Sequence, residues 1–161
     1  MNVKRVVIDS SVALKWRLRD EEATSQADAL LDDFLSGALG LLTTTLFDYE
    51  IANALKVAVT KGRLSEDGAM AALDDFQQYS IQRFDFWEIQ GLAFQLARQH
   101  QRSVYDSAYL ALAQSKGLWF YTGDRRLFNA VRDTLPWVRW IGDYQIDAIP
   151  STATVEEGTV E

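Results

Sequence analysis

Hydrophobic residues along the chain follow two alternating patterns. Short apolar, β-branched or aromatic runs predict strands at residues 5–9, 39–43, 81–84, 118–121 and 138–141. Longer segments with apolar residues at helical spacing predict helices over residues 12–18, 22–35, 46–60, 65–79, 87–99, 104–115 and 125–134. Strands that alternate with helices are typical of an α/β domain, and we expect a mainly parallel sheet.

Length and composition fit one globular domain. The chain has 161 residues, of which 48% are hydrophobic, and this is enough for a single core. We expect the folded domain to cover residues 1–147. After Pro150 the sequence is rich in Ser, Thr, Gly and Glu, which predicts a flexible acidic tail over residues 148–161.

The composition also limits the chemistry of any metal site. The chain has no cysteine and one histidine, which excludes disulfides, thiolate zinc sites and most histidine-built centres. Oxygen ligands remain. No stretch is long and apolar enough to form a signal-peptide core or a transmembrane helix, so we expect a cytoplasmic protein without membrane contact.

The net charge of −7 argues against a protein that binds nucleic acid through a general basic field. The placement of charge can differ from its sum, because several basic residues stand close to particular acids in the sequence. Lys15, Arg17 and Arg19 follow Asp9, Arg102 precedes Asp106, and Arg125 and Arg126 follow Asp124.

Two of the acids stand at predicted strand ends. Asp9 ends the first strand, and Asp124 follows the strand at 118–121. Either residue can simply cap the helix that comes after it. In open α/β sheets, however, ligands bind outside the carboxyl ends of the strands, near the point where the strand order reverses. Two such ends that deliver carboxylates to one edge favour a shared site.

Glu50 is best judged against its neighbour Asp48. Asp48 stands three residues after Thr45, which is the spacing of a capping box. We therefore expect Thr45 to cap the helix and Asp48 to form the reciprocal hydrogen bond of the box. Glu50 lies on the shoulder of the apolar face of the same helix, where a carboxylate is partly desolvated. Asn53, one turn further, can hydrogen-bond Glu50 or a bound water.

Asp106 stands near the start of a helix that is apolar almost all round. The segment from Ser103 to Asp106 repeats the capping spacing, so a structural reading of Asp106 stays open. The N-terminus of a helix also favours an ionised carboxylate, and capping is therefore compatible with metal binding.

Carboxylates that converge repel one another, and at least one takes up a proton unless a cation neutralises them. The acids considered as one site are Asp9, Glu50, Asp106 and Asp124. With only oxygen ligands on offer, Mg²⁺ or Mn²⁺ is favoured. Such ions can activate a water and clamp a phosphodiester, and paired ions are a recurrent nuclease arrangement.

Other polar residues can support such a site. Ser10, Ser11 and Thr122 are placed to orient carboxylates or water. Arg125 and Arg126 are placed to hold a nucleic-acid strand.

Four segments together resemble a PIN domain, and more specifically the VapC toxins of bacterial and archaeal toxin–antitoxin pairs. They carry Asp9 within VIDSSVALKW, Glu50 within YEIANAL, Asp106 within YDSAYLALA and Asp124 within YTGDRRL. Each segment is weak alone, but the ordered set, from Val6 to Leu127, is fairly specific.

The resemblance implies a small parallel sheet flanked by helices in three layers, with the four acids as the acidic cluster. It further implies Mg²⁺- or Mn²⁺-dependent endoribonuclease activity, a homodimer, and a VapB-type antitoxin that covers the site. Some family members carry a further acid or Asn shortly after the last Asp, and here Asn129 is the nearest candidate. The number of metal ions, one or two, stays open.

Three other functions are weighed against a toxin ribonuclease. A PIN nuclease of ordinary RNA processing would have the same residues but no antitoxin. A signalling domain that accepts phosphate on Asp9 would need an adjacent acidic pair and a later Lys, which the chain does not supply convincingly. A haloacid-dehalogenase-like phosphatase would need a second Asp at the position that Ser11 occupies.

Overall fold

The computed structural model describes residues 3–151. The strands of this part of the chain form one sheet in the order β3-β2-β1-β4-β5, and every neighbouring pair is parallel. Their bounds are β1 Lys4–Ile8, β2 Leu39–Thr44, β3 Gln82–Phe84, β4 Trp119–Thr122 and β5 Val138–Trp140. The predicted α/β class and parallel sheet are confirmed.

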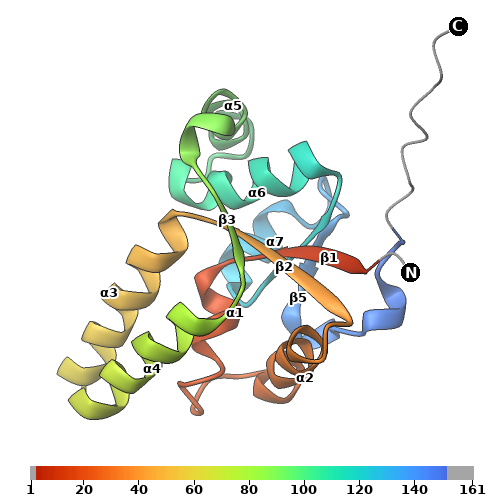
Figure 1. The fold of residues 1–161 in the computed structure, drawn as a ribbon. Helices are drawn as coiled ribbons and strands as arrows, with labels where there is room; N and C mark the ends of the chain where they lie inside the picture. Colours follow the sequence, from red (N-terminus) through yellow and green to blue (C-terminus); the bar gives the residue numbers. More distant parts are fainter. Residues whose placement is uncertain (1–2, 152–161) are drawn as a thin grey trace, which may run out of the picture.

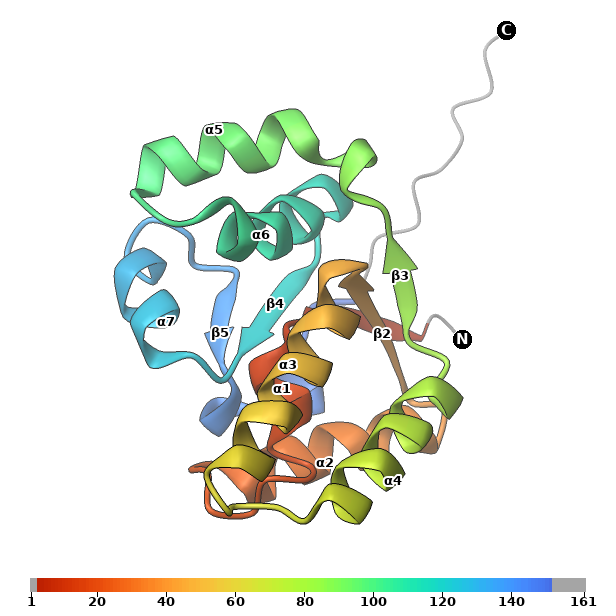
Figure 2. The same ribbon diagram turned by 90° about the vertical axis from the view of Figure 1, so that its left-hand side faces the viewer.

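Helices cover both faces of the sheet, which gives the predicted three layers. In Figures 1 and 2, α5 and α6 lie on one side of the strands, and α2 and α4 lie on the other. The α-helices are α1 Ser10–Leu14, α2 Thr24–Leu35, α3 Leu46–Thr60, α4 Glu66–Gln78, α5 Gln90–His100, α6 Val104–Lys116 and α7 Arg125–Val131. Three short 3₁₀ segments complete the described elements: η1 Phe86–Glu88, η2 Ile141–Asp143 and η3 Ile146–Ala148.

Helix α6 is the most enclosed helix of the described chain. Every residue from Ser107 to Ala113 is buried, because α6 packs on the sheet with one face and against α5 with another (Figure 2). A helix buried on two sides needs apolar residues around most of its circumference. The sequence of residues 104–115 has this property, since it is apolar almost all round.

Most predicted helices differ from the structure by one to three residues at an end, and two differ more. The helix expected over residues 12–18 is replaced by α1, which stops at Leu14. The amides of Lys15, Trp16 and Arg17 each donate to a carbonyl three residues earlier, which is the pattern of tighter turns. The helix expected over residues 87–99 is divided into η1 and α5.

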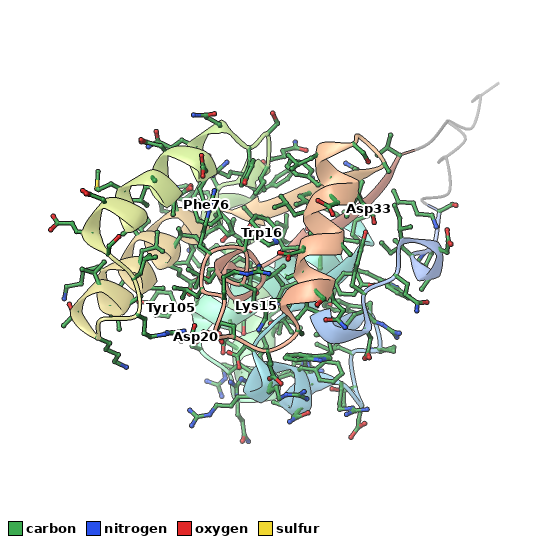
Figure 3. All side chains as sticks on the ribbon, turned by 90° about the horizontal axis from the view of Figure 1, so that it is seen from below. Lys15, Trp16, Asp20, Asp33, Phe76 and Tyr105 are labelled. Atoms are coloured by element: carbon green, nitrogen blue, oxygen red, sulfur yellow. The ribbon has the colours of Figure 1, made fainter. Side chains whose placement is uncertain are left out.

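Trp16 anchors these turns in the core. Its indole Nε1 donates to the carbonyl of Ala27 in α2 over 2.9 Å, and its ring stacks on Phe76 of α4 with 6.0 Å between ring centroids. Both side chains are labelled in Figure 3, which views the helices on this side of the sheet. The segment that follows α1 is therefore fixed by packing.

The chain is folded up to the end of its described part. Ile149 is 3% exposed and belongs to the core, so the folded region reaches slightly beyond residue 147. The remainder of the predicted acidic tail, residues 152–161, lies outside the described residues. Between residues 3 and 151, no helix has the length and apolar character needed to cross a membrane.

Candidate active site

The four acids lie around the carboxyl edge of the sheet. The chain runs from β1 through β2 to β3 on one side and then returns to β4, so the strand order reverses between β1 and β4. Asp9 directly follows β1, and Asp124 comes two residues after the end of β4. Ligands of open α/β sheets bind at such a reversal. Glu50 and Asp106 reach the same region from α3 and α6, as their electrostatic effects on these acids indicate.

Asp9 does not cap α1. It occupies the N-cap position, but its side chain makes no capping hydrogen bond. Its carboxylate is 6% exposed and accepts hydrogen bonds from the hydroxyl of Ser11 and, over 2.6 Å, from the hydroxyl of Thr122. The capping explanation of Asp9 is therefore wrong, and two hydroxyls fix a buried carboxylate at the strand end.

The loop after β4 is tied to the start of α1. The amide of Gly123 donates to Oγ of Ser11 over 2.8 Å, and the amide of Asp124 donates to Oγ1 of Thr122 over 3.1 Å. A Cβ atom on Gly123 would lie 2.5 Å from Cε of Lys15 and 3.0 Å from the carbonyl oxygen of Ser11. A side chain does not fit there, so glycine allows the close approach of the two segments.

Glu50 is held at one oxygen by two donors. The hydroxyls of Tyr109 and Ser10 both donate to Oε1, the latter over 3.3 Å. The expected capping box beside it is wrong, because Thr45 makes no side-chain cap. Asp48 instead forms a bidentate ion pair with Arg83, with bonds of 2.7 and 2.8 Å. Arg83 lies on β3, which pairs with β2 in the sheet, and local spacing cannot reveal such a partner.

Asp106 and Asp124 both stand at helix starts. Oγ of Ser103 accepts from the amide of Asp106 over 3.0 Å, so Ser103 caps α6 as expected. The carboxylate of Asp106 accepts a hydrogen bond from the guanidinium of Arg102 over 3.3 Å. Oδ1 of Asp124 accepts from the amides of Arg126 and Leu127 at 2.9 and 3.2 Å, so Asp124 does cap α7. Its other oxygen makes no hydrogen bond within the described chain.

Burial and mutual repulsion raise the proton affinity of these acids. Burial raises the pKa of Asp9 from 3.8 to about 7, although the two hydroxyl donors oppose the rise. The charges of Glu50 and Asp124 raise the pKa further. Burial is also the main cause of the raised pKa values of Glu50 and Asp106, and the charge of Asp124 contributes to both.

A hard divalent cation fits this donor set. The site offers only carboxylate and hydroxyl oxygens, which Mg²⁺ and Mn²⁺ prefer, and a positive charge would remove the repulsion. In residues 3–151, no three acidic or histidine side chains stand together as a ready-made cage for a metal ion. The carboxylates nonetheless lie close enough to raise one another's pKa.

Within the described chain, the side chains of three predicted supporting residues make no hydrogen bond to the acids: one is engaged with other partners, and the other two are exposed. Arg125 pairs with Glu22 at 2.7 and 3.1 Å and lies 4.2 Å from the ring centre of Trp140. Asn53 is exposed on α3 and makes no hydrogen bond to Glu50. Arg126 is exposed at the start of α7. Of the two predicted partners of Asn53, Glu50 and a bound water, Glu50 accepts no hydrogen bond from it, and Arg125 is not a free cation.

The basic residues that follow Asp9 in sequence are likewise paired. Arg17 contacts Asp75 and Arg19 contacts Asp28. The ammonium of Lys15, which is 2% exposed, donates to the backbone carbonyl of Glu22 over 2.8 Å. These side chains stabilise the fold around the site, and their position in sequence is a poor guide to a phosphate-binding surface.

Sequence reasoning missed Tyr109. Its hydroxyl contacts Glu50, and it stands three residues after Asp106 on α6. A signal was available, because residues three apart share one face of a helix. The apolar pattern of α6 hides this signal, because Tyr109 also belongs to the buried surface of the helix.

Comparison with known proteins places the chain in a family. The PIN domain family model matches residues 6–133, and the chain therefore belongs to the PIN domain family. Ribonuclease VapC3 of Pyrobaculum aerophilum is 34% identical over 125 residues, which cover 76% of this chain and 92% of that protein. Ribonuclease VapC12 of Mycobacterium tuberculosis is 29% identical over 122 residues, covering 76% and 88%.

Solved structures agree with the fold. PAE2754 from Pyrobaculum aerophilum gives a TM-score of 0.56 at 23% identity, over 80% of this chain and 79% of its own. VapC20 of Mycobacterium tuberculosis, described as a toxin that cleaves the sarcin-ricin loop, gives 0.56 at 16% identity, over 78% and 94%. At these identities the likeness concerns the fold alone.

Proposed function

We propose that the protein is a metal-dependent endoribonuclease that acts as the toxin of a VapBC-type toxin–antitoxin pair. The observation that carries this proposal is the buried carboxylate of Asp9, which shares the reversal point of the sheet with other acids that raise its pKa. Buried carboxylates that raise one another's pKa stay ionised at neutral pH only if a cation compensates their charge. The names of VapC3 and VapC12 as ribonucleases support RNA as the substrate.

The proposed cation is Mg²⁺ or Mn²⁺, held by Asp9, Glu50, Asp106 and Asp124. When bound, such an ion supplies a nucleophile from water and neutralises charge on a phosphodiester. The chain's own groups prepare the site in advance. Hydroxyls fix both oxygens of Asp9, and backbone amides fix one oxygen of Asp124.

Fixing these carboxylates before RNA binds reduces the reorganisation that the reaction requires. Arg126, exposed next to Asp124, is the basic residue that we assign to the RNA strand.

An apolar surface beside the acids supports a protein partner. A cavity of about 550 Å³ lies between the starts of α3 and α6 and is lined by Thr44, Thr45, Leu46, Tyr49, Phe86, Val104, Tyr105 and Ala108. The rings of Tyr49 and Tyr105 are 79% and 66% exposed, and each precedes one of the acids in sequence. Exposed apolar patches of this kind mark interaction sites.

We propose that a VapB-type antitoxin occupies this surface and thereby covers Glu50 and Asp106. We further propose that the toxin is a homodimer and acts on RNA in the cytoplasm. Size-exclusion chromatography with light scattering tests the dimer, for which a monomeric mass would be the contrary result.

Induced expression in a bacterial host tests the toxin function. We expect growth arrest with the wild-type protein, and normal growth with folded Asp9→Asn or Asp124→Asn proteins. Asn caps a helix as well as Asp does, so the second variant should keep the start of α7 intact. Arrest by either folded variant would exclude the proposed mechanism.

The antitoxin is tested by searching beside the gene for a short reading frame and co-expressing any that is found. Restored growth is expected if that frame encodes the partner. Cleavage of RNA without growth arrest, and without any inhibiting partner, would instead indicate a PIN nuclease of ordinary RNA processing.

A further inference from the structure

Tyr109 joins three elements at the carboxyl edge of the sheet. It stands on α6, is 2% exposed, and stacks on Phe120 of β4 with ring centroids 6.0 Å apart and ring planes inclined by 8°. Its hydroxyl donates to Oε1 of Glu50 on α3. The stacked ring cannot move without disturbing the core, so the hydroxyl is held at a fixed point.

The two carboxylate oxygens of Glu50 differ in their hydrogen bonding. Oε1 accepts from Tyr109 and, over a longer 3.3 Å, from Ser10 on α1. Oε2 accepts no hydrogen bond within the described residues. One oxygen is therefore anchored, and the other remains for a ligand.

Glu50 needs such an anchor more than the other acids do. Its side chain has more rotatable bonds than that of Asp, and fixing them costs conformational entropy. Asp9 is held by two hydroxyls and Asp124 by two backbone amides. For Glu50, Tyr109 is the close donor, because the bond from Ser10 is long.

We propose that Tyr109 is a positioning residue whose hydroxyl holds Glu50 so that Oε2 serves as a ligand for the divalent cation. This inference rests on the proposed function. Residues that orient metal ligands through hydrogen bonds typically change metal affinity by about 10- to 100-fold when they are removed. Tyr109 does not contact the reacting groups itself.

The test compares Tyr109→Phe with a matched variant elsewhere. The substitution Tyr109→Phe would keep the stacked ring and remove only the hydroxyl. Tyr144→Phe removes a similarly buried phenol hydroxyl, which donates to Asp33 over 2.7 Å on the other side of the sheet. The two variants should lose similar stability, but only one of them touches a proposed ligand.

Mn²⁺ binding to the metal-free proteins is measured by isothermal titration calorimetry, without RNA. We expect Tyr109→Phe to raise the Kd for Mn²⁺ about tenfold and Tyr144→Phe to leave it unchanged. An unchanged Kd in a folded Tyr109→Phe protein overturns the proposal. An equal loss of affinity in Tyr144→Phe also overturns it, because the effect would then follow from stability.

A double-mutant cycle with Glu50→Gln tests whether Tyr109 acts through Glu50. In the Glu50→Gln background, Tyr109→Phe should cause no further loss of Mn²⁺ affinity, and an undiminished tenfold effect would contradict the proposed route. RNA cleavage by the wild type separates this inference from the function on which it rests. Cleavage with an unchanged Kd in Tyr109→Phe rejects the positioning role alone, whereas a wild type that neither binds Mn²⁺ nor cleaves RNA rejects both.

Discussion

The substitution Asp9→Asn should stabilise the metal-free protein at neutral pH, although it removes a residue of the proposed active site. Asp9 is buried beside other carboxylates, and its pKa of about 7 lies above the value of 3.8 for an unperturbed Asp. The folded state therefore binds a proton more tightly than the unfolded state. Stability from this residue is fully present below pH 3.8 and is lost as the pH rises through 7.

The size of the effect follows from the two pKa values. The difference between about 7 and 3.8, at about 1.4 kcal/mol per pH unit, gives about 4 kcal/mol in the free energy of unfolding. Asparagine resembles the protonated carboxyl group, so Asp9→Asn should exceed the wild type by up to about 4 kcal/mol at pH 8. Between pH 6 and pH 8 the wild type should lose about 1 kcal/mol relative to the variant.

Urea unfolding in the presence of EDTA, followed by tryptophan fluorescence at pH 6, 7 and 8, measures these differences. This range avoids the isoelectric point of about 4.7, where the protein is least soluble. Asp74→Asn, an exposed carboxylate on α4, serves as the control and should change stability little. If Asp9→Asn were no more stable than the wild type at pH 8, the reasoning from burial and repulsion would be refuted.

Three further predictions concern the site and the loop after β4. Asp124→Asn should lower RNA cleavage by at least about 100-fold while the melting temperature changes little, because Asn preserves the cap of α7; a large drop in melting temperature would instead indicate a mainly structural role. Millimolar Mg²⁺ or Mn²⁺ should raise the melting temperature of the wild type in differential scanning fluorimetry, because a ligand that binds only the folded state stabilises it, and Asp9→Asn should respond much less. Gly123→Ala should cost about 1–3 kcal/mol, because the new Cβ atom would lie 2.5 Å from Cε of Lys15 and 3.0 Å from the carbonyl oxygen of Ser11; chemical denaturation that gave a stability equal to the wild type would contradict this.

The elements that sequence predicted best are those whose pattern is long and regular. Helix α3 has the predicted bounds, Leu46–Thr60, because its apolar residues repeat over four turns and a glycine ends it. The short helix α1 was predicted too long, because Trp16 and Leu18, which follow it, are apolar for another reason. Trp16 faces α2 and α4, and tertiary contacts of this kind leave no local period.

Some features of the candidate site could likewise be predicted from the sequence, and others could not. The strand-end position of Asp9 could be inferred from topology, since parallel strands of an open sheet present their carboxyl ends at one edge. The partners of charged side chains could not be inferred. Asp48 pairs with Arg83 and does not form a capping box with Thr45. Arg125 pairs with Glu22, which is 103 residues away in the chain. Such ion pairs depend on how distant segments meet in the folded protein.

The most direct test is cleavage of an end-labelled RNA by the purified protein as the Mn²⁺ concentration is varied. We predict cleavage by the wild type that rises with Mn²⁺ and stops on addition of EDTA, and none by folded Asp9→Asn protein at any Mn²⁺ concentration. Cleavage that persisted in EDTA, or at the wild-type rate in Asp9→Asn, would contradict a nuclease site built from these acids.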